Sequence, residues 1–264
     1  MKFTYDHDLH IHSHISACSN DPEQNNERIL QYAKENNLKT ICLTDHFWDS
    51  VVPGASSWYS FQNYEHISRA LPLPQDKDIR FLFGCEAEYD KHMTVGISKE
   101  RMDSFDFIII PTTHFHMTDF TISAEDSESP EKIAKVWIKK LNHLLEMDLP
   151  FKQIGIAHLT CGLIAKPKEN FIKTLNAIPD KEMGIIFKQA AKLGVGIELN
   201  SDDMSFKHAE PEIILKPYKI AKECGCKFYC GSDAHHPATF ETAKSIFERA
   251  INLLELNETD KFMI

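Results

Sequence analysis

The segment YDHDLHIHSH, residues 5–14, places histidines at alternate positions of a strand-like stretch. Five later segments share its design, a short hydrophobic run that ends in or leads into a histidine, aspartate or glutamate: TICLTDH (40–46), FLFGCEAEYD (81–90), FIIIPTTHFH (107–116), IGIAHLT (154–160) and KFYCGSDAHH (227–236). Parallel strands in a barrel bring their C-terminal ends to one face, and such barrels carry out their chemistry there. The six segments together therefore predict a parallel barrel with a multi-metal hydrolytic site on that face.

Strand-like and helix-like segments alternate along the chain, and about seven strands are expected. The predicted strands cover residues 6–13, 40–44, 79–88, 107–111, 153–157, 195–200 and 227–231. The predicted helices cover residues 25–37, 64–71, 130–147, 169–178, 181–193, 210–224 and 239–256, and Ser129 and Pro130 are suited to begin the longest one. Repeated strand–helix units predict a parallel sheet. The length of 264 residues fits one barrel, so residues 1–264 are expected to form a single domain.

The composition of the chain predicts the cellular compartment and the class of binding partner. The seven cysteines are an odd number and no secretion signal opens the chain, which predicts a reduced, cytoplasmic protein. No apolar run approaches the roughly 18 residues that a membrane span requires, so no membrane role is expected. The 39 acidic and 29 basic residues give a net charge of −10, which disfavours binding to nucleic-acid phosphates. A small soluble substrate is the expected partner, and the oligomeric state stays open.

The histidines of the first motif, residues 8–14, are interpreted together with the polar residues at the other predicted strand ends. Because residues two apart in a strand share a face, we expect Asp8, His10 and His12 to face one way, and Leu9 and Ile11 to face the helices. A His-x-His pair alone is a weak signal of a metal site. Seven further residues that occupy the same structural position strengthen it: Asp45, His46, Glu86, His114, His158, Asp233 and His235. Such a mixed imidazole and carboxylate set suits zinc, iron or manganese.

The ordered motifs resemble those of the PHP (polymerase and histidinol phosphatase) metallohydrolases. The matching segments cover nearly the whole chain: DLHIHS (8–13), LTDH (43–46), GCEAEY (84–89), TTHF (112–115), IAHL (156–159), IELNS (197–201) and GSDAH (231–235). The resemblance implies the family's α/β fold, a distorted seven-stranded (β/α)7 barrel that is similar to a TIM barrel. This agrees with the strand count obtained from the pattern alone.

The resemblance also implies a cluster of two or three divalent transition-metal ions. The implied ligands of the first ion are His10, His12, Glu86 and Asp233, and those of the second are the bridging Glu86 with His114 and His158. His46 and His235 would share the third ion with a residue of the first loop. At the position where related phosphatases commonly carry a histidine, this chain has Cys18. Its thiolate is a suitable zinc ligand, and the alternative is that water or Asp21 completes the site.

Ions held in this way imply phosphoester hydrolysis, because bound metal can lower the pKa of water to about 7 and so supply hydroxide. The expected reaction is attack of a metal-bound hydroxide on phosphorus, with Glu86 and Asp233 as catalytic residues that hold the ions. Either a protonated imidazole or a metal-bound water is expected to protonate the leaving alkoxide. Strand alternation favours His116 or His14 for that role.

Other residues are candidates for substrate contacts. Lys166, shortly after the strand that leads to His158, and Arg101 are basic residues that could bind a substrate phosphate. Trp58, Tyr59 and Phe61 follow the second predicted strand. These aromatic residues either line a substrate pocket or anchor a long loop.

Three classes of function remain. The leading one is a metal-dependent phosphomonoesterase for a small phosphorylated metabolite, with histidinol phosphate as the best single candidate by resemblance. The second is a nuclease or nucleotide phosphoesterase, which the acidic net charge disfavours for polynucleotide substrates. The third is a non-catalytic metal-binding regulatory domain, which the eight intact candidate ligands argue against.

Overall fold

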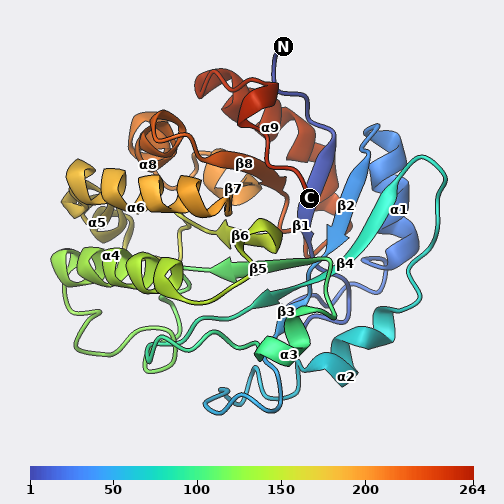
Figure 1. Ribbon diagram of the computed structural model, residues 1–264, viewed down its shortest axis with the longest axis horizontal. Coiled ribbons are helices and arrows are strands. Elements are labelled where there is room, and N and C mark those ends of the chain that lie inside the picture. Colours follow the sequence, from blue (N-terminus) through green and yellow to red (C-terminus); the bar gives the residue numbers. More distant parts are fainter.

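Seven parallel strands form a nearly closed barrel in a computed structural model that describes all residues, 1–264 (Figure 1). The strands lie in the order β1 (His7–Ile11), β2 (Thr40–Leu43), β4 (Arg80–Ala87), β5 (Phe107–Pro111), β6 (Ile154–Ala157), β7 (Gly196–Asn200) and β8 (Lys227–Gly231). A short strand, β3 (His46–Phe47), continues the path of β2 and pairs with the end of β4. The predicted distorted (β/α)7 barrel is confirmed.

Helices surround the strands on the outside of the barrel (Figure 1). They are α1 (Asn26–Glu35), α2 (Tyr64–Ile67), α3 (Lys99–Met102), α4 (Pro130–Glu146), α5 (Lys168–Ala177), α6 (Asp180–Leu193), α7 (Ser201–Met204), α8 (Pro211–Glu223) and α9 (Phe240–Leu253). The longest, α4, begins as predicted: the Ser129 side chain accepts a hydrogen bond from the Lys132 backbone N–H, and Pro130 occupies the first turn. No helix combines the length and the apolar character that a bilayer crossing requires.

The barrel closes between β1 and β8 mainly through side chains. The backbone N–H of Cys230 donates to His7 Nε2 at 3.1 Å, and that of Ser232 donates to Asp8 Oδ1 at 2.9 Å. Farther up, backbone hydrogen bonds join the two segments, including Asp233 N to His10 O at 2.7 Å. Burial raises the pKa of Asp8 to about 6, although the bonds from Ser232 favour its ionised form. Closure thus begins directly below the first histidine motif.

The pairing of β1 with β2 shifts in register between Asp8 and Ile11, so the side chains of β1 do not alternate between the two faces as expected. Leu9 packs inside the barrel, whereas Asp8 binds the hydroxyl of Tyr32 on α1. The prediction that Leu9 faces the helices and that Asp8 shares a face with His10 was therefore wrong. The irregularity in pairing interrupts the two-residue period, so that Leu9 and His10 both lie inside the barrel while Ile11 joins the outer core.

The core has two parts. The larger apolar cluster lies between the barrel and its helices. A smaller one fills the lower barrel, and its members are Leu9, Cys42, Leu82, Phe107, Ile109, Ala157, Tyr229 and Phe262. Gly155 on β6 belongs to this layer because a Cβ there would overlap the ring of Tyr229. The filled interior supports the polar residues above it and leaves no channel through the barrel.

Gly155→Ala should lower the free energy of unfolding by about 1–3 kcal/mol, the usual cost of overpacking a dense core. The rigid Tyr229 ring must shift to admit the methyl group. Gly184→Ala is the control because a Cβ at that position in α6 meets nothing within 4 Å. The control should gain about 0.5–1 kcal/mol through helix propensity. Urea denaturation measures both, and equal stability of Gly155→Ala and the parent would contradict the packing described here.

Candidate metal centre

Eight side chains proposed as ligands from the sequence converge above the C-terminal ends of the strands. They are His10, His12, His46, Glu86, His114, His158, Asp233 and His235, and the contacts among them join all eight. They come from β1, β3 and β4 or from the residues that follow β1, β5, β6 and β8. Residues far apart in sequence are thus brought together because every strand runs in the same direction.

Glu86 lies at the centre of this cluster and is fully buried. Its Oε2 atom lies 2.8 Å from His46 Nδ1, 3.4 Å from His12 Nε2 and 3.6 Å from His10 Nε2. Its Oε1 atom lies 3.3 Å from His158 Nε2. One carboxylate therefore faces two separate groups of imidazoles, which is the arrangement required of a residue that bridges two ions.

Distances between the candidate donor atoms fit ligands that surround shared ions. His10 Nε2 and His12 Nε2 are 3.1 Å apart, and Asp233 Oδ1 lies 3.4 and 3.1 Å from these two atoms, respectively. Ligands of a tetrahedral zinc ion with bonds of 2.0–2.2 Å are separated by about 3.3–3.6 Å. Both Glu86 oxygens and His158 Nε2 are buried without a hydrogen-bond partner. A buried, unpaired donor set of this kind is chemically suited to divalent metal.

The pKa shifts of His10 and Glu86 also favour a bound divalent cation. Burial lowers the pKa of His10, but the carboxylates of Glu198, Asp233 and Glu86 outweigh it and raise the value to about 10. Burial likewise opposes ionisation of Glu86, but His46 and His10 hold its pKa well below the usual range. The carboxylates thus require positive charge around them, and a divalent cation supplies it when it replaces the imidazole proton.

Further carboxylates orient the imidazoles from behind. Glu198 Oε1 lies 2.6 Å from His10 Nδ1, and its Oε2 accepts the backbone N–H of His158 at 3.1 Å. Glu88 Oε2 lies 2.9 Å from His114 Nδ1 and also accepts the hydroxyl of Tyr59 at 2.7 Å. When Nδ1 of each histidine donates to the carboxylate, Nε2 is left as the free donor atom for metal.

Sequence reasoning did not assign Glu198 and Glu88 to the site. The available signals were a charged residue inside the apolar strand β7 and a glutamate two positions after Glu86. A third orienting contact was also missed: His12 Nδ1 lies 3.0 Å from Ser16 Oγ, which donates to Asp45.

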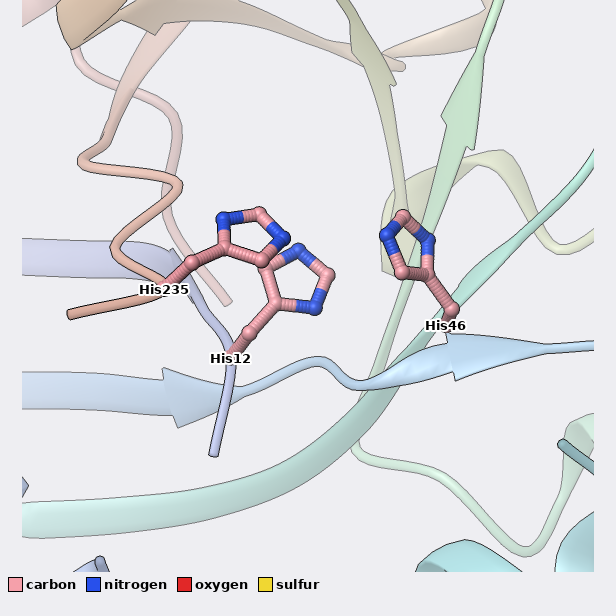
Figure 2. A group of neighbouring side chains, drawn as sticks. All are labelled: His12, His46 and His235. Carbon is pink, nitrogen blue, oxygen red and sulfur yellow. The ribbon is translucent and has the colours of Figure 1, made fainter. Parts of the chain in front are cut away.

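A third donor group consists of His12, His46 and His235, whose ligand atoms lie within 4.8 Å of one another. Figure 2 shows the three rings facing a common space, with the His235 ring stacked on that of His12. Cys18 lines the pocket beside this group. Burial opposes thiolate formation, but His46 and His235 lower the pKa of Cys18 to about 7. Asp21, the alternative first-loop ligand, instead contacts His236 at 2.7 Å.

The cluster opens into a pocket of about 440 Å³. Trp58, Tyr59 and His116 line it, so two of the three aromatic candidates are at the pocket. Phe61 is 47% exposed and packs on His66. Desolvation, followed by the neighbouring His114, lowers the pKa of His116 to about 4, which leaves its imidazole neutral near pH 7.

The remaining candidates are dispersed. Lys166 lines a second cavity next to the first one. Arg101 lies over the ring of Tyr64 and 3.9 Å from Asp49, outside the lining of both cavities, so the structure does not bring it to the cluster. His14 is exposed and does not line the pocket.

Glu198→Gln should weaken metal binding by about 10- to 100-fold, because the amide no longer fixes the His10 tautomer as a carboxylate does. Competition with a chromogenic chelator measures the affinity without any assay of turnover. Glu248→Gln, an exposed change on α9, is the control and should bind metal like the parent. Parent-like affinity in Glu198→Gln would exclude the proposed orienting role.

Comparisons with known proteins agree with this geometry. Two proteins named "Probable phosphatase" are similar, one from Caldicellulosiruptor bescii, 23% identical over 87% of this chain and 81% of its own length, and one from Caldicellulosiruptor saccharolyticus, 24% identical over 86% and 80%. The fold is similar to that of histidinol phosphate phosphatase from Lactococcus lactis, solved with zinc, L-histidinol and phosphate; the TM-score is 0.57, with 17% identity over 93% of each chain. A protein from Listeria monocytogenes has a TM-score of 0.63, with 16% identity over 91% of this chain and 99% of its own. The PHP domain model matches residues 8–250, and the chain therefore belongs to the PHP domain family.

Proposed function

We propose that the protein is a metal-dependent phosphomonoesterase that acts on a small phosphorylated metabolite. The observation that carries this proposal is the buried Glu86 carboxylate, which faces two groups of imidazoles at the base of a pocket of about 440 Å³. A pocket of this size suits a metabolite. The names of the similar proteins are consistent with phosphatase chemistry.

The proposed division of labour follows from the position of each side chain. His10, His12, Glu86 and Asp233 would hold one ion, Glu86 with His114 and His158 a second, and His46 and His235 with Cys18 a third. Bound divalent ions would act as Lewis acids and would provide hydroxide near neutral pH. Glu198 and Glu88 keep the imidazoles oriented, and Trp58 helps to exclude water from the pocket.

The surroundings of His116 keep its imidazole neutral, so it can serve as a hydrogen-bond donor but not as a cationic acid near pH 7. Its neutral imidazole near pH 7 can donate one hydrogen bond to the leaving-group oxygen from the wall of the pocket. This differs from the protonated imidazole expected from the sequence. In the proposed reaction His116 is a catalytic residue through this hydrogen bond.

Histidinol phosphate is the first substrate to test. The support for it is the L-histidinol and phosphate complex of the Lactococcus lactis protein, whose fold is similar. The net charge of −10 argues against a polynucleotide substrate, so no nuclease activity is proposed.

Protein purified without chelator should contain two or three transition-metal ions per chain, because the candidate donor groups overlap in two or three proposed sites. The same preparation should hydrolyse at least one member of a panel of phosphorylated metabolites that includes L-histidinol phosphate. Elemental analysis and phosphate release are the two measurements. Less than one ion per chain, or phosphate release no faster than in a chelator-treated sample, would contradict the proposal.

Glu86→Gln should reduce turnover to below a few per cent, because an amide cannot bridge two cations as a carboxylate does. The barrel should remain folded, since the lower core does not include this residue. Phosphate release and circular dichroism test the two statements separately. A folded variant with substantial activity would show that Glu86 is not the bridge.

Cys18→Ser should lower the metal content by one ion, because a hydroxyl does not ionise near neutral pH and binds zinc far more weakly than a thiolate. Cys18→His should retain the ion. Cys224→Ser is a matched control, because Cys224 lies at the end of α8, where its thiol contacts Gly184 O. Unchanged stoichiometry in Cys18→Ser would exclude the thiol as a ligand.

A further inference from the structure

A second cavity of about 250 Å³ adjoins the metal pocket. His116 and Leu163 line both cavities, so the two spaces meet at these side chains. The second cavity lies between the loop that follows β5 and the segment that leads into α5. A substrate whose alcohol part passes His116 and Leu163 would enter this second space.

The charges around the two cavities are strongly unequal. In the metal pocket the acidic residues are Glu86 and Asp233, which already belong to the metal-binding cluster. No aspartate or glutamate lines the second cavity, and Lys166 is its one residue with a permanent charge. An ammonium group on the substrate would thus find no free carboxylate in either space.

Lys166 is itself available for an anion. It is exposed and has no acidic partner within 4.0 Å. The nearby acidic loop does not neutralise it, because Glu125 and Glu128 lie 3.8 and 2.8 Å from Lys132 instead. Ser127, Ser129 and Asn170 line the same cavity, and their side chains bond to the backbone at Ala124 O, Lys132 N and Lys166 O, respectively.

We propose that the second cavity receives the alcohol part of the substrate and selects for a carboxylate or similar anion there, paired with Lys166. This inference rests on the proposed phosphomonoesterase function and specifies its substrate class. It ranks phosphate esters of acidic alcohols above those of amino alcohols. L-Histidinol phosphate, whose amine is cationic, should then be hydrolysed more slowly than an ester of an acidic alcohol, and it serves as the reference substrate.

Three aryl phosphates of equal leaving-group character test the proposal: 4-ethylphenyl phosphate, 4-(2-carboxyethyl)phenyl phosphate and 4-(2-aminoethyl)phenyl phosphate. Two methylene groups separate each charge from the ring, so the esters differ chiefly in the charge of the tail. The metal-loaded parent should prefer the carboxylate over the ammonium ester by about two- to fivefold in kcat/KM, the effect of one exposed ion pair.

Lys166→Glu should invert this preference, and Lys166→Met should bring the ratio close to that of a neutral site. Lys168→Glu is the matched control, because Lys168 is exposed nearby but does not line the cavity, and its ratio should equal the parent's. An unchanged ratio in Lys166→Glu, or a parent that prefers the ammonium ester, would overturn the inference. An equal fall for all three esters would also overturn it, because Lys166 would then bind the reacting phosphate. Failure to hydrolyse even 4-ethylphenyl phosphate would instead count against the phosphomonoesterase function.

Discussion

The active face of this barrel depends on one buried charge, the carboxylate of Glu86. An ionised carboxylate that is removed from water loses several kcal/mol of solvation unless positive charge compensates for it. In this chain the compensation comes from imidazoles on both sides, and each of them is also a candidate metal ligand by chemistry and spacing. The same buried carboxylate thus sets the electrostatics of the upper barrel and lies at the centre of the candidate metal site.

The orienting carboxylates connect this charge to the frame of the barrel. Glu198 binds the His10 side chain and the His158 backbone. One residue of β7 therefore positions two candidate ligands, one in β1 and one directly after β6. Gly231 makes this arrangement possible, because a Cβ there would overlap Glu198 and lie 2.7 Å from the Cβ of His10. Metal affinity is thus a property of strand packing as much as of the ligands themselves.

Catalysis and substrate selection have different structural origins in this molecule. The metal-binding side chains stand at or next to strand ends, where the barrel fixes their positions. The walls that would contact the alcohol part of a substrate come from the segments after β3, β5 and β6. Such segments can change without loss of the metal centre, which explains how one fold can serve several phosphoesters.

Much of the site was predictable because its signals are local. An apolar run that ends in a histidine or carboxylate marks a strand end, and the start of α4 at Ser129 depends on a hydrogen bond across three residues. The carboxylate contact that orients His10 was not predictable in this way, because its partner Glu198 lies 188 positions away. The positions of Lys166 and Arg101 relative to the site were equally unpredictable, because both residues lie in connections between strands rather than in the strands themselves.

The seven strands, their parallel arrangement and the eight residues that converge were all predictable from the sequence, because periodicity and strand ends depend on neighbours within a few positions. The inward position of Leu9 and the contact of Asp8 with Tyr32 became known from the three-dimensional structure alone. That arrangement follows from the register shift where β1 meets β2 and β8, and such a shift leaves no mark in local alternation. An irregularity of this kind depends on how β1 pairs with strands that are distant in sequence, whereas the pattern of side chains records only the strand to which they belong.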